Sequence, residues 1–209
     1  MAPPERGCLI AFEGTEGAGK STQIRLAAAV VRGRGFAVVE TREPGGTALG
    51  IELRRLVMHH DGTPPVPLTE LLVYLADRAQ HVTEVIAPAL ARGEVVLTDR
   101  FTASTIAYQG YARHLDLDMV SRLDAIARQG TEPALTVLLD CPVELGLRRA
   151  RGDDRFHRED TAFHERVRAG FLSLARQAPE RYCVIDAAQD AAAVQQQVAA
   201  ALIECVSRL

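Results

Sequence analysis

Nine consecutive residues near the beginning of the sequence have types and spacing suited to binding phosphate: Gly14-Thr15-Glu16-Gly17-Ala18-Gly19-Lys20-Ser21-Thr22. They match the pattern G-x-x-x-x-G-K-[ST], follow a short apolar run and lead into a segment with helical spacing. Glycines let successive backbone N–H groups point into one concavity, and the N-terminus of the helix adds a positive dipole. We therefore expect the run to bind ATP, with Lys20 spanning the β- and γ-phosphates and the Ser21 hydroxyl at a Mg²⁺ position.

Lys20 stands out in composition as well as in the motif. Of the 24 basic residues 23 are arginines, so Lys20 is the only lysine in the chain. A GTPase would ordinarily read guanine with an Asn/Thr-Lys-x-Asp segment, which needs a second lysine, so that class is excluded. The alternative interpretation is a glycine-rich turn without a nucleotide. It would require the preceding strand, the spacing of the motif, the following helix and the only lysine to occur together by chance.

Further polar segments follow later predicted strands. One reads Thr41-Arg42-Glu43-Pro44-Gly45-Gly46-Thr47, an arginine at a strand end before a rigid turn. Another reads Asp99-Arg100-Phe101 and is followed by Ser104-Thr105 and Tyr108-Gln109-Gly110. Together with the phosphate-binding loop, these segments resemble the thymidylate kinase family, from about Leu9 to at least Asp186. The resemblance implies transfer of the γ-phosphoryl group of ATP to dTMP, giving dTDP and ADP for dTTP synthesis.

The resemblance also implies roles at the acceptor phosphate. Arg42 and Arg100 correspond to residues that hold the dTMP 5′-phosphate, whose oxygens suit a planar guanidinium, and Pro44 shapes the turn beside them. Asp99 is similar to a carboxylate that reaches Mg²⁺ through water. Surface ion pairing for the arginines and a helix cap for Asp99 are the alternatives.

For the base and sugar, the family places an aromatic ring and an arginine on one helix face. Tyr74 and Arg78, four residues apart, match that pair, although the family often has Phe where Tyr74 stands, and Tyr74 could equally be a core residue. The remaining implied dTMP contacts are Glu16 near the 3′-hydroxyl, Tyr108 under the deoxyribose, and Thr105 and Gln109 at the pocket edge.

An arginine-rich segment around 148–160 is expected to form a mobile lid over ATP. In the resembled family the arginine that stabilises the transferring phosphoryl group comes either from the phosphate-binding loop or from the lid. Here the loop's variable positions carry no arginine, so Arg151 and Arg155 are the catalytic candidates and Arg149 is expected against adenine. The alternative for each is a solvated charged surface.

These side chains need elements to position them. Apolar runs predict strands at Cys8–Phe12, Phe36–Glu40, Val95–Thr98, Leu135–Leu139 and Cys183–Ile185. Helical spacing in Thr22–Arg32, Thr69–Ala91 and Asp160–Arg176 separates some of them. Alternation of this kind predicts an α/β fold, a P-loop NTPase-like three-layer sandwich with a five-stranded parallel sheet, over one domain spanning residues 1–209.

The net charge and the hydropathy of the chain limit the kinds of partner that it can bind. A net charge of -3 gives no basic excess for nucleic acid, and no apolar run approaches a membrane span. The four cysteines show no C-x-x-C pair, as expected for reduced thiols in the cytoplasm, and a homodimer is implied by the resemblance alone. Two alternatives remain open: a kinase of the same architecture for another nucleoside monophosphate or a small alcohol, and a non-catalytic ATP-binding protein.

Overall fold

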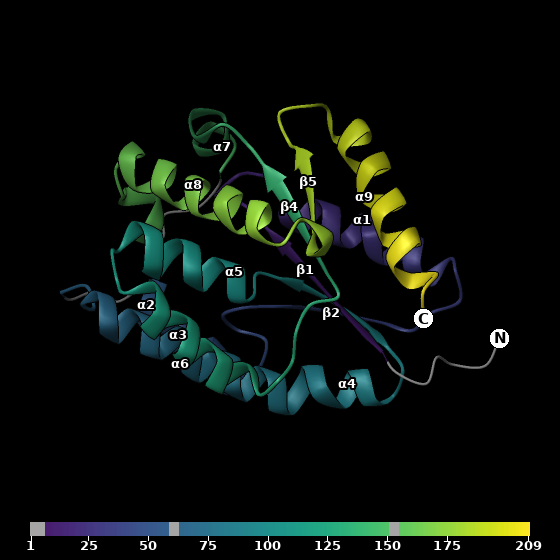
Figure 1. Ribbon diagram of the computed structural model, residues 1–209, viewed down its shortest axis with the longest axis horizontal. Helices are drawn as coiled ribbons and strands as arrows, with labels where there is room; N and C mark the ends of the chain where they lie inside the picture. Colours follow the sequence, from purple (N-terminus) through teal and green to yellow (C-terminus); the bar gives the residue numbers. More distant parts are fainter. Residues whose placement is uncertain (1–6, 59–62, 151–154) are drawn as a thin grey trace.

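A computed structural model describes residues 7–58, 63–150 and 155–209. Its centre is a sheet of five parallel strands in the order β2-β3-β1-β4-β5, which confirms the predicted fold (Figure 1). The strands are β1 Cys8–Glu13, β2 Val38–Arg42, β3 Val95–Asp99, β4 Leu135–Asp140 and β5 Tyr182–Asp186. β2 begins and ends two residues later than predicted. Arg42 therefore ends the strand itself, paired in register with Asp99 of β3.

Helices connect the strands on both sides of the sheet (Figure 1). The first half of the chain supplies α1 Lys20–Arg32, α2 Ala48–Met58, α3 Pro67–His81, η1 Val82–Ile86, α4 Ala87–Ala91, α5 Thr102–Thr105 and η2 Ile106–Ala112. The second half supplies α6 Leu117–Arg128, α7 Val143–Arg149, η3 Arg155–Arg158, α8 Thr161–Gln177, η4 Pro179–Arg181 and α9 Ala191–Val206. The helix predicted over Thr69–Ala91 corresponds to α3, η1 and α4 together, with η1 forming a π-helical turn. Among the described residues, no helix has the length and apolar character needed to cross a membrane.

β1 contributes side chains to two apolar cores, one on each face of the sheet, because its side chains alternate between the two faces. Ile10 and Phe12 point into a core shared with α1 and α9, which lie side by side in Figure 1. Leu9 and Ala11 point into a core shared with η1 and α4. With both faces covered, the polar ends of the strands are left for the site.

A third apolar cluster lies where η2, η3 and α8 meet. Tyr108 packs edge-on against Phe156, with ring centroids 5.5 Å apart, and against Phe163 and Phe171 at 6.1 and 6.2 Å. Rings in such arrangements hold one another in place. This cluster fixes Tyr108 beside the carboxyl end of the sheet.

Candidate active site

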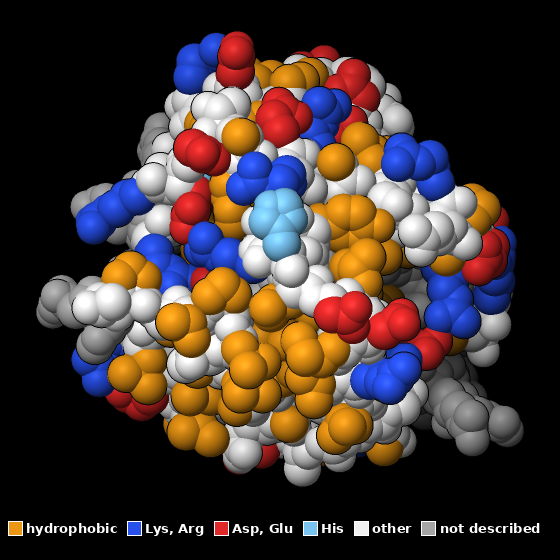
Figure 2. Space-filling model, turned by 60° about the vertical axis from the view of Figure 1, so that its left-hand side comes forward, with side chains coloured by type: hydrophobic (Ala, Val, Ile, Leu, Met, Phe, Trp, Pro, Cys, Tyr) orange, Lys and Arg blue, Asp and Glu red, His pale blue; other side chains and the backbone are white. Residues whose placement is uncertain are grey.

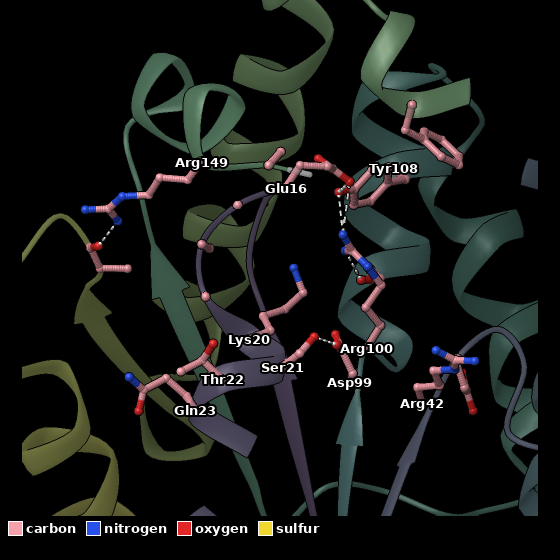
Figure 3. Close-up of a pocket in the computed structure, with 18 of the residues that line it drawn as sticks. Glu16, Lys20, Ser21, Thr22, Gln23, Arg42, Asp99, Arg100, Tyr108 and Arg149 are labelled. Carbon is pink, nitrogen blue, oxygen red and sulfur yellow. Dashed lines mark hydrogen bonds and ion pairs between the residues drawn. The ribbon is translucent and has the colours of Figure 1, made fainter. Parts of the chain in front are cut away.

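The carboxyl ends of β1, β2 and β3 open on a cavity of about 870 Å³, near the upper end of the range for ligand pockets. Figure 3 shows the phosphate-binding loop on one side of this cavity and Arg42, Asp99 and Arg100 on the other. Most of the predicted site residues line it: Glu16, Gly17, Ala18, Gly19, Lys20, Ser21, Thr22, Arg42, Pro44, Tyr74, Arg78, Asp99, Arg100, Thr105, Tyr108, Gln109 and Arg149.

The phosphate-binding loop is organised around Lys20, the first residue of α1. The Lys20 ammonium is buried and donates hydrogen bonds to the carbonyl oxygens of Gly14 and Thr15, both at 3.0 Å. Gly14 and Gly19 have φ angles of 142° and 94°, which L-residues with side chains rarely adopt. Burial, followed by the nearby Arg100, lowers the pKa of Lys20 to about 8. An anion bound in the loop would relieve both effects.

The Ser21 hydroxyl donates a hydrogen bond to the Asp99 carboxylate at 3.0 Å, linking α1 to the end of β3 (Figure 3). Mg²⁺ prefers oxygen ligands and keeps several waters, and these two oxygen-bearing side chains beside a phosphate-binding loop fit such an ion. Among the described residues, no group of three or more His, Cys, Asp or Glu side chains could hold a metal by itself.

Arg100 lies at the centre of the acceptor side. Its backbone has a φ of 74°, and the buried Glu13 carboxylate stabilises the following turn by accepting hydrogen bonds from the N–H groups of Phe101 and Ser104 at 2.8 and 3.1 Å. The guanidinium donates to the Ser104 hydroxyl at 2.9 Å and to Glu16 at 3.0 Å. A strained backbone held by a buried carboxylate thus aims this side chain at the phosphate-binding loop.

Glu16 and Tyr108 complete the same network. The Tyr108 hydroxyl donates to Glu16 at 2.6 Å and receives a hydrogen bond from Arg100 at 3.0 Å. Burial opposes the charge on Glu16, but contacts with His164, Arg100 and Lys20 outweigh it and hold the pKa of this carboxyl below its ordinary value. Glu16 is therefore an ionised acceptor at the centre of the cavity.

The turn after β2 is held by residues of α3. The Glu43–Pro44 peptide bond is cis, and the Gly45 N–H donates to Asp77 at 2.9 Å. His81 contacts Glu43 at 2.9 Å through Nδ1 and Thr41 at 2.6 Å through Nε2. The buried ring of His81 therefore ties the turn to α3.

Arg78 is held in a buried ionic network on the cavity wall. Its guanidinium pairs with Glu43 at 2.7 Å, contacts Asp124 and donates to the Thr105 hydroxyl at 2.8 Å. Two carboxylates raise its pKa, although burial opposes this. Tyr74, one turn earlier on the helix, also lines the cavity and packs against the cluster around Phe156. The predicted base-side pair therefore shares one wall, with the arginine firmly oriented.

The residues expected in the lid lie in different places. Arg149, at the end of α7, donates to the carbonyl oxygens of Ala187 and Ala188 at 2.7 and 3.4 Å, next to the start of α9 (Figure 3). Arg155 forms an ion pair with the buried Glu70 of α3. Arg151 lies outside the described residues.

Several lining residues were missed by sequence reasoning. Arg54 of α2 donates to the Pro44 carbonyl at 3.1 Å, and Ser104 receives its bond from Arg100. The cavity is also lined by Phe156, which packs against Tyr74 and Tyr108, and by Gln189, Asp190 and Val194. Asp124 had a detectable signal, because it is a carboxylate within the otherwise apolar stripe of α6. Arg54 had none, since an arginine on a helix is ordinarily a surface residue.

This geometry defines a class. A phosphate-binding loop that opens α1, a Ser–Asp pair suited to Mg²⁺ and arginines on the opposite wall are the features of a P-loop phosphotransferase acting on two phosphate-bearing substrates. Comparison with known proteins identifies the family within that class.

The family model for thymidylate kinase matches residues 12–198. The chain is 50% identical to a thymidylate kinase of Geobacter sulfurreducens over 97% of this chain and 99% of that protein. It is 47% identical to one of Geotalea uraniireducens, over 94% and 97% of the two chains. A thymidylate kinase of Synechococcus sp. (strain JA-2-3B'a(2-13)) is 53% identical over 85% of each chain. The chain belongs to the thymidylate kinase family.

Proposed function

We propose that the protein transfers the γ-phosphoryl group of ATP to dTMP, forming dTDP and ADP. The observation that carries this function is the shared cavity, in which Lys20 of the phosphate-binding loop faces Arg42 and Arg100 of the acceptor side. The family supplies the identity of the two nucleotides. In-line transfer requires the γ-phosphate of ATP and the phosphate of dTMP to lie next to each other, with their negative charge neutralised. Lys20, Arg42 and Arg100 line one cavity and could do both.

ATP binds with its phosphates on the loop 14–22 and its base toward Arg149. The loop offers backbone N–H groups and the Lys20 ammonium to the phosphate oxygens. Arg149 is held against the start of α9 by the carbonyl oxygens of Ala187 and Ala188, which leaves the face of its guanidinium for adenine. Ser21 and Asp99 would hold Mg²⁺, which would neutralise charge on the phosphates of ATP.

dTMP binds on the opposite wall. Arg42 and Arg100 hold the 5′-phosphate beside the turn containing Pro44, and Glu16 accepts from the 3′-hydroxyl. Tyr108 packs under the deoxyribose and disfavours a 2′-hydroxyl. Tyr74 stacks on thymine, and the remaining base contacts come from Arg78, Thr105 and Gln109. This arrangement is supported by the lining of the cavity and by the network joining Arg100, Glu16 and Tyr108.

The catalytic arginine is supplied by the lid, around residues 148–160, with Arg151 and Arg155 as the candidates. Arg155 is paired with Glu70, so it must exchange that partner for phosphate oxygens if it acts in the transition state. Such an exchange would let the arginine strengthen its contact only as charge develops on the transferring group.

The test is to measure kcat and KM for ADP formation with ATP, Mg²⁺ and each deoxynucleoside monophosphate in turn. We expect dTMP to give the highest kcat/KM by at least tenfold. A higher value with another monophosphate would identify a different kinase of the same architecture, and no acceptor-dependent ADP would support a non-catalytic ATP-binding protein.

We also propose that the protein forms a homodimer through α2 and α3. Figure 2 shows hydrophobic side chains gathered on the lower half of the face that carries these helices. The exposed members include Leu49, Ile51, Leu56, Val66, Leu68 and Leu72. An apolar patch of this kind marks an interaction surface.

The four free thiols support the proposal that the protein is located in the reducing cytoplasm.

A further inference from the structure

Glu70 is a buried carboxylate that the proposed mechanism does not use. It lies on α3, four residues before Tyr74 and eight before Arg78, on the helix face that forms the cavity wall. Its side chain is only 1% exposed. A carboxylate buried to this extent needs a specific set of partners.

Those partners come from η2, with the residue that follows it, and from η3. Gln109 donates its amide nitrogen to Glu70 Oε1 at 2.7 Å. Arg113 approaches both carboxylate oxygens, at 3.3 and 3.4 Å, and Arg155 pairs with Oε2. A second carboxylate, that of Glu159, pairs with Arg113 at 2.5 Å. It takes no part in the hydrogen bond between Gln109 and Glu70. Two guanidinium groups favour the ionised form of Glu70, which can only accept hydrogen bonds.

From this arrangement we infer that Glu70 is a positioning residue that selects the base of the acceptor by fixing the orientation of the Gln109 amide. An ionised carboxylate requires the NH₂ end of the amide, so the carbonyl oxygen is the end that Gln109 can offer to a ligand. Gln109 itself lines the cavity.

The orientation of the amide determines which pyrimidine fits. Thymine and uracil carry an N3–H group, which can donate a hydrogen bond to the carbonyl oxygen of Gln109. N3 of cytosine carries no proton and is an acceptor, so it cannot form a hydrogen bond with that oxygen. An unsatisfied polar contact in a buried site is unfavourable. Glu70 therefore contributes to the preference for dTMP over dCMP and has no effect on the choice between dTMP and dUMP. This inference rests on the proposed function, in which Gln109 faces the base.

The test compares Glu70→Gln with the wild type for dTMP, dUMP and dCMP. In the variant, Arg113 and Arg155 take the oxygen of the new amide, so its NH₂ group faces Gln109 and turns the Gln109 amide over. We expect the ratio of kcat/KM for dTMP to that for dCMP to fall roughly ten- to hundred-fold. The ratio of dTMP to dUMP should stay within about twofold. Inhibition constants replace kcat/KM where turnover is too slow.

Glu159→Gln is the matched control, because it removes the other carboxylate of the same ionic cluster and leaves the Glu70–Gln109 contact in place. It should keep the dTMP to dCMP ratio of the wild type even if its stability falls. An unchanged ratio in Glu70→Gln, or an equal fall in both variants, would overturn the inference. If the wild type itself showed no preference for dTMP over dCMP, the proposed function would fail instead.

A second measurement uses the wild-type protein and does not depend on the folding of a variant. In an NMR spectrum of the complex with dTMP, the thymine N3 imino proton should exchange with water more slowly than in free dTMP, because a protein oxygen accepts it. An imino proton that exchanges as fast as in free dTMP would contradict the inference.

Discussion

At the scale of single residues, Lys20 shows how one position can be chosen for chemistry. Its ammonium is buried and donates hydrogen bonds to the carbonyl oxygens of Gly14 and Thr15. In the proposed mechanism these contacts fix the cation where negative charge develops, and a fixed charge of this kind is an effective form of electrostatic stabilisation.

Lys20→Ala should therefore lower kcat by a factor on the order of 10²–10³, since it removes a preorganised cation from the transferring phosphoryl group. Steady-state kinetics would measure this, with thermal unfolding as a check that the fold is kept. Arg25→Ala is the control, because Arg25 is an exposed residue of the same helix and its loss should leave kcat within about twofold. Near-normal turnover of Lys20→Ala would remove Lys20 from this role.

Arg155 gives a second prediction at this scale. If it acts in the transition state, Arg155→Ala should reduce kcat at least tenfold while changing the Kd for dTMP by less than about threefold. Single-turnover rates and equilibrium titration would separate the two effects. A variant with unchanged kcat would leave Arg151 as the remaining lid candidate.

Candidate site residues could be identified where the motif is local in sequence. The phosphate-binding loop and the segments 41–47 and 99–101 were recognised because their residues are consecutive. The partners of Asp124 and Glu70 could not be recognised in this way. Arg78 lies 46 residues from Asp124 in the sequence, and Gln109 lies 39 residues from Glu70. A polar residue within a helix has no partner visible in the sequence.

At the scale of elements, α7 meets the phosphate-binding loop through two glycines. A Cβ on Gly146 would lie 2.5 Å from the Glu16 carbonyl oxygen, and one on Gly17 would lie 1.9 Å from the Gly146 carbonyl oxygen. The two backbones are therefore in direct contact. This approach holds α7 against the loop that we propose binds ATP.

Gly146→Ala should force α7 away from the loop, lowering the free energy of unfolding by about 1–3 kcal/mol and raising the KM for ATP. Urea unfolding and steady-state kinetics would measure the two effects. Gly33→Ala is the control, because Gly33 has a helical φ of -62° and its nearest atom to a new Cβ is 3.3 Å away. Equal effects of the two substitutions would contradict the close contact.

The turn after β2 gives a pH-dependent prediction. Burial, followed by the charge of Glu43, raises the pKa of Asp77 from 3.8 to about 6, while the Gly45 N–H, His81 and Arg78 oppose the rise. Between pH 4 and 6 the folded protein then binds a proton that the unfolded chain does not, so stability falls as pH rises through this window. The change is on the order of 3 kcal/mol.

Asp77→Asn should remove this dependence, because asparagine still accepts from Gly45 but does not titrate. The free energy of unfolding of the wild type minus that of the variant should decrease between pH 4 and 6.5, as measured by urea unfolding. Parallel stability curves for the two proteins would show that Asp77 keeps its ordinary pKa.

Secondary structure was largely predictable at this scale. β1, β3 and β4 are largely buried and mostly apolar, whereas β2 and β5 are mostly half-buried or exposed, yet each strand lies within about two residues of its predicted position. The π-helical turn Val82–Ile86 was not predictable, because its apolar spacing continues that of the helix before it. The turn at Glu43–Pro44 was recognised as rigid, but its supports, Asp77 and His81, depend on how α3 packs.

At the scale of the whole molecule, the two proposed nucleotide sites share one cavity, while the apolar patch on α2 and α3 lies outside it. Both helices also line that cavity, through Arg54 on α2 and Tyr74 on α3. Dimer formation would therefore bury the outer surface of helices whose inner surface lies against the proposed dTMP site.

Ile51, 54% exposed on α2, is suited to testing this interface. Ile51→Glu should shift the protein from dimer to monomer in sedimentation at about 10 μM, because a charge would be buried in an apolar contact. Val184→Glu is the control, since Val184 is 47% exposed on the edge strand β5, away from the patch. A monomeric wild type at this concentration would reject the dimer.

The most direct experiment is to incubate the protein with ATP, Mg²⁺ and dTMP and to separate the nucleotides by chromatography over time. One dTDP should form for each ADP, with little free phosphate, because we propose that Lys20, Arg42 and Arg100 bring the two substrates together in one cavity. ADP released with free phosphate and without dTDP would contradict phosphoryl transfer to dTMP.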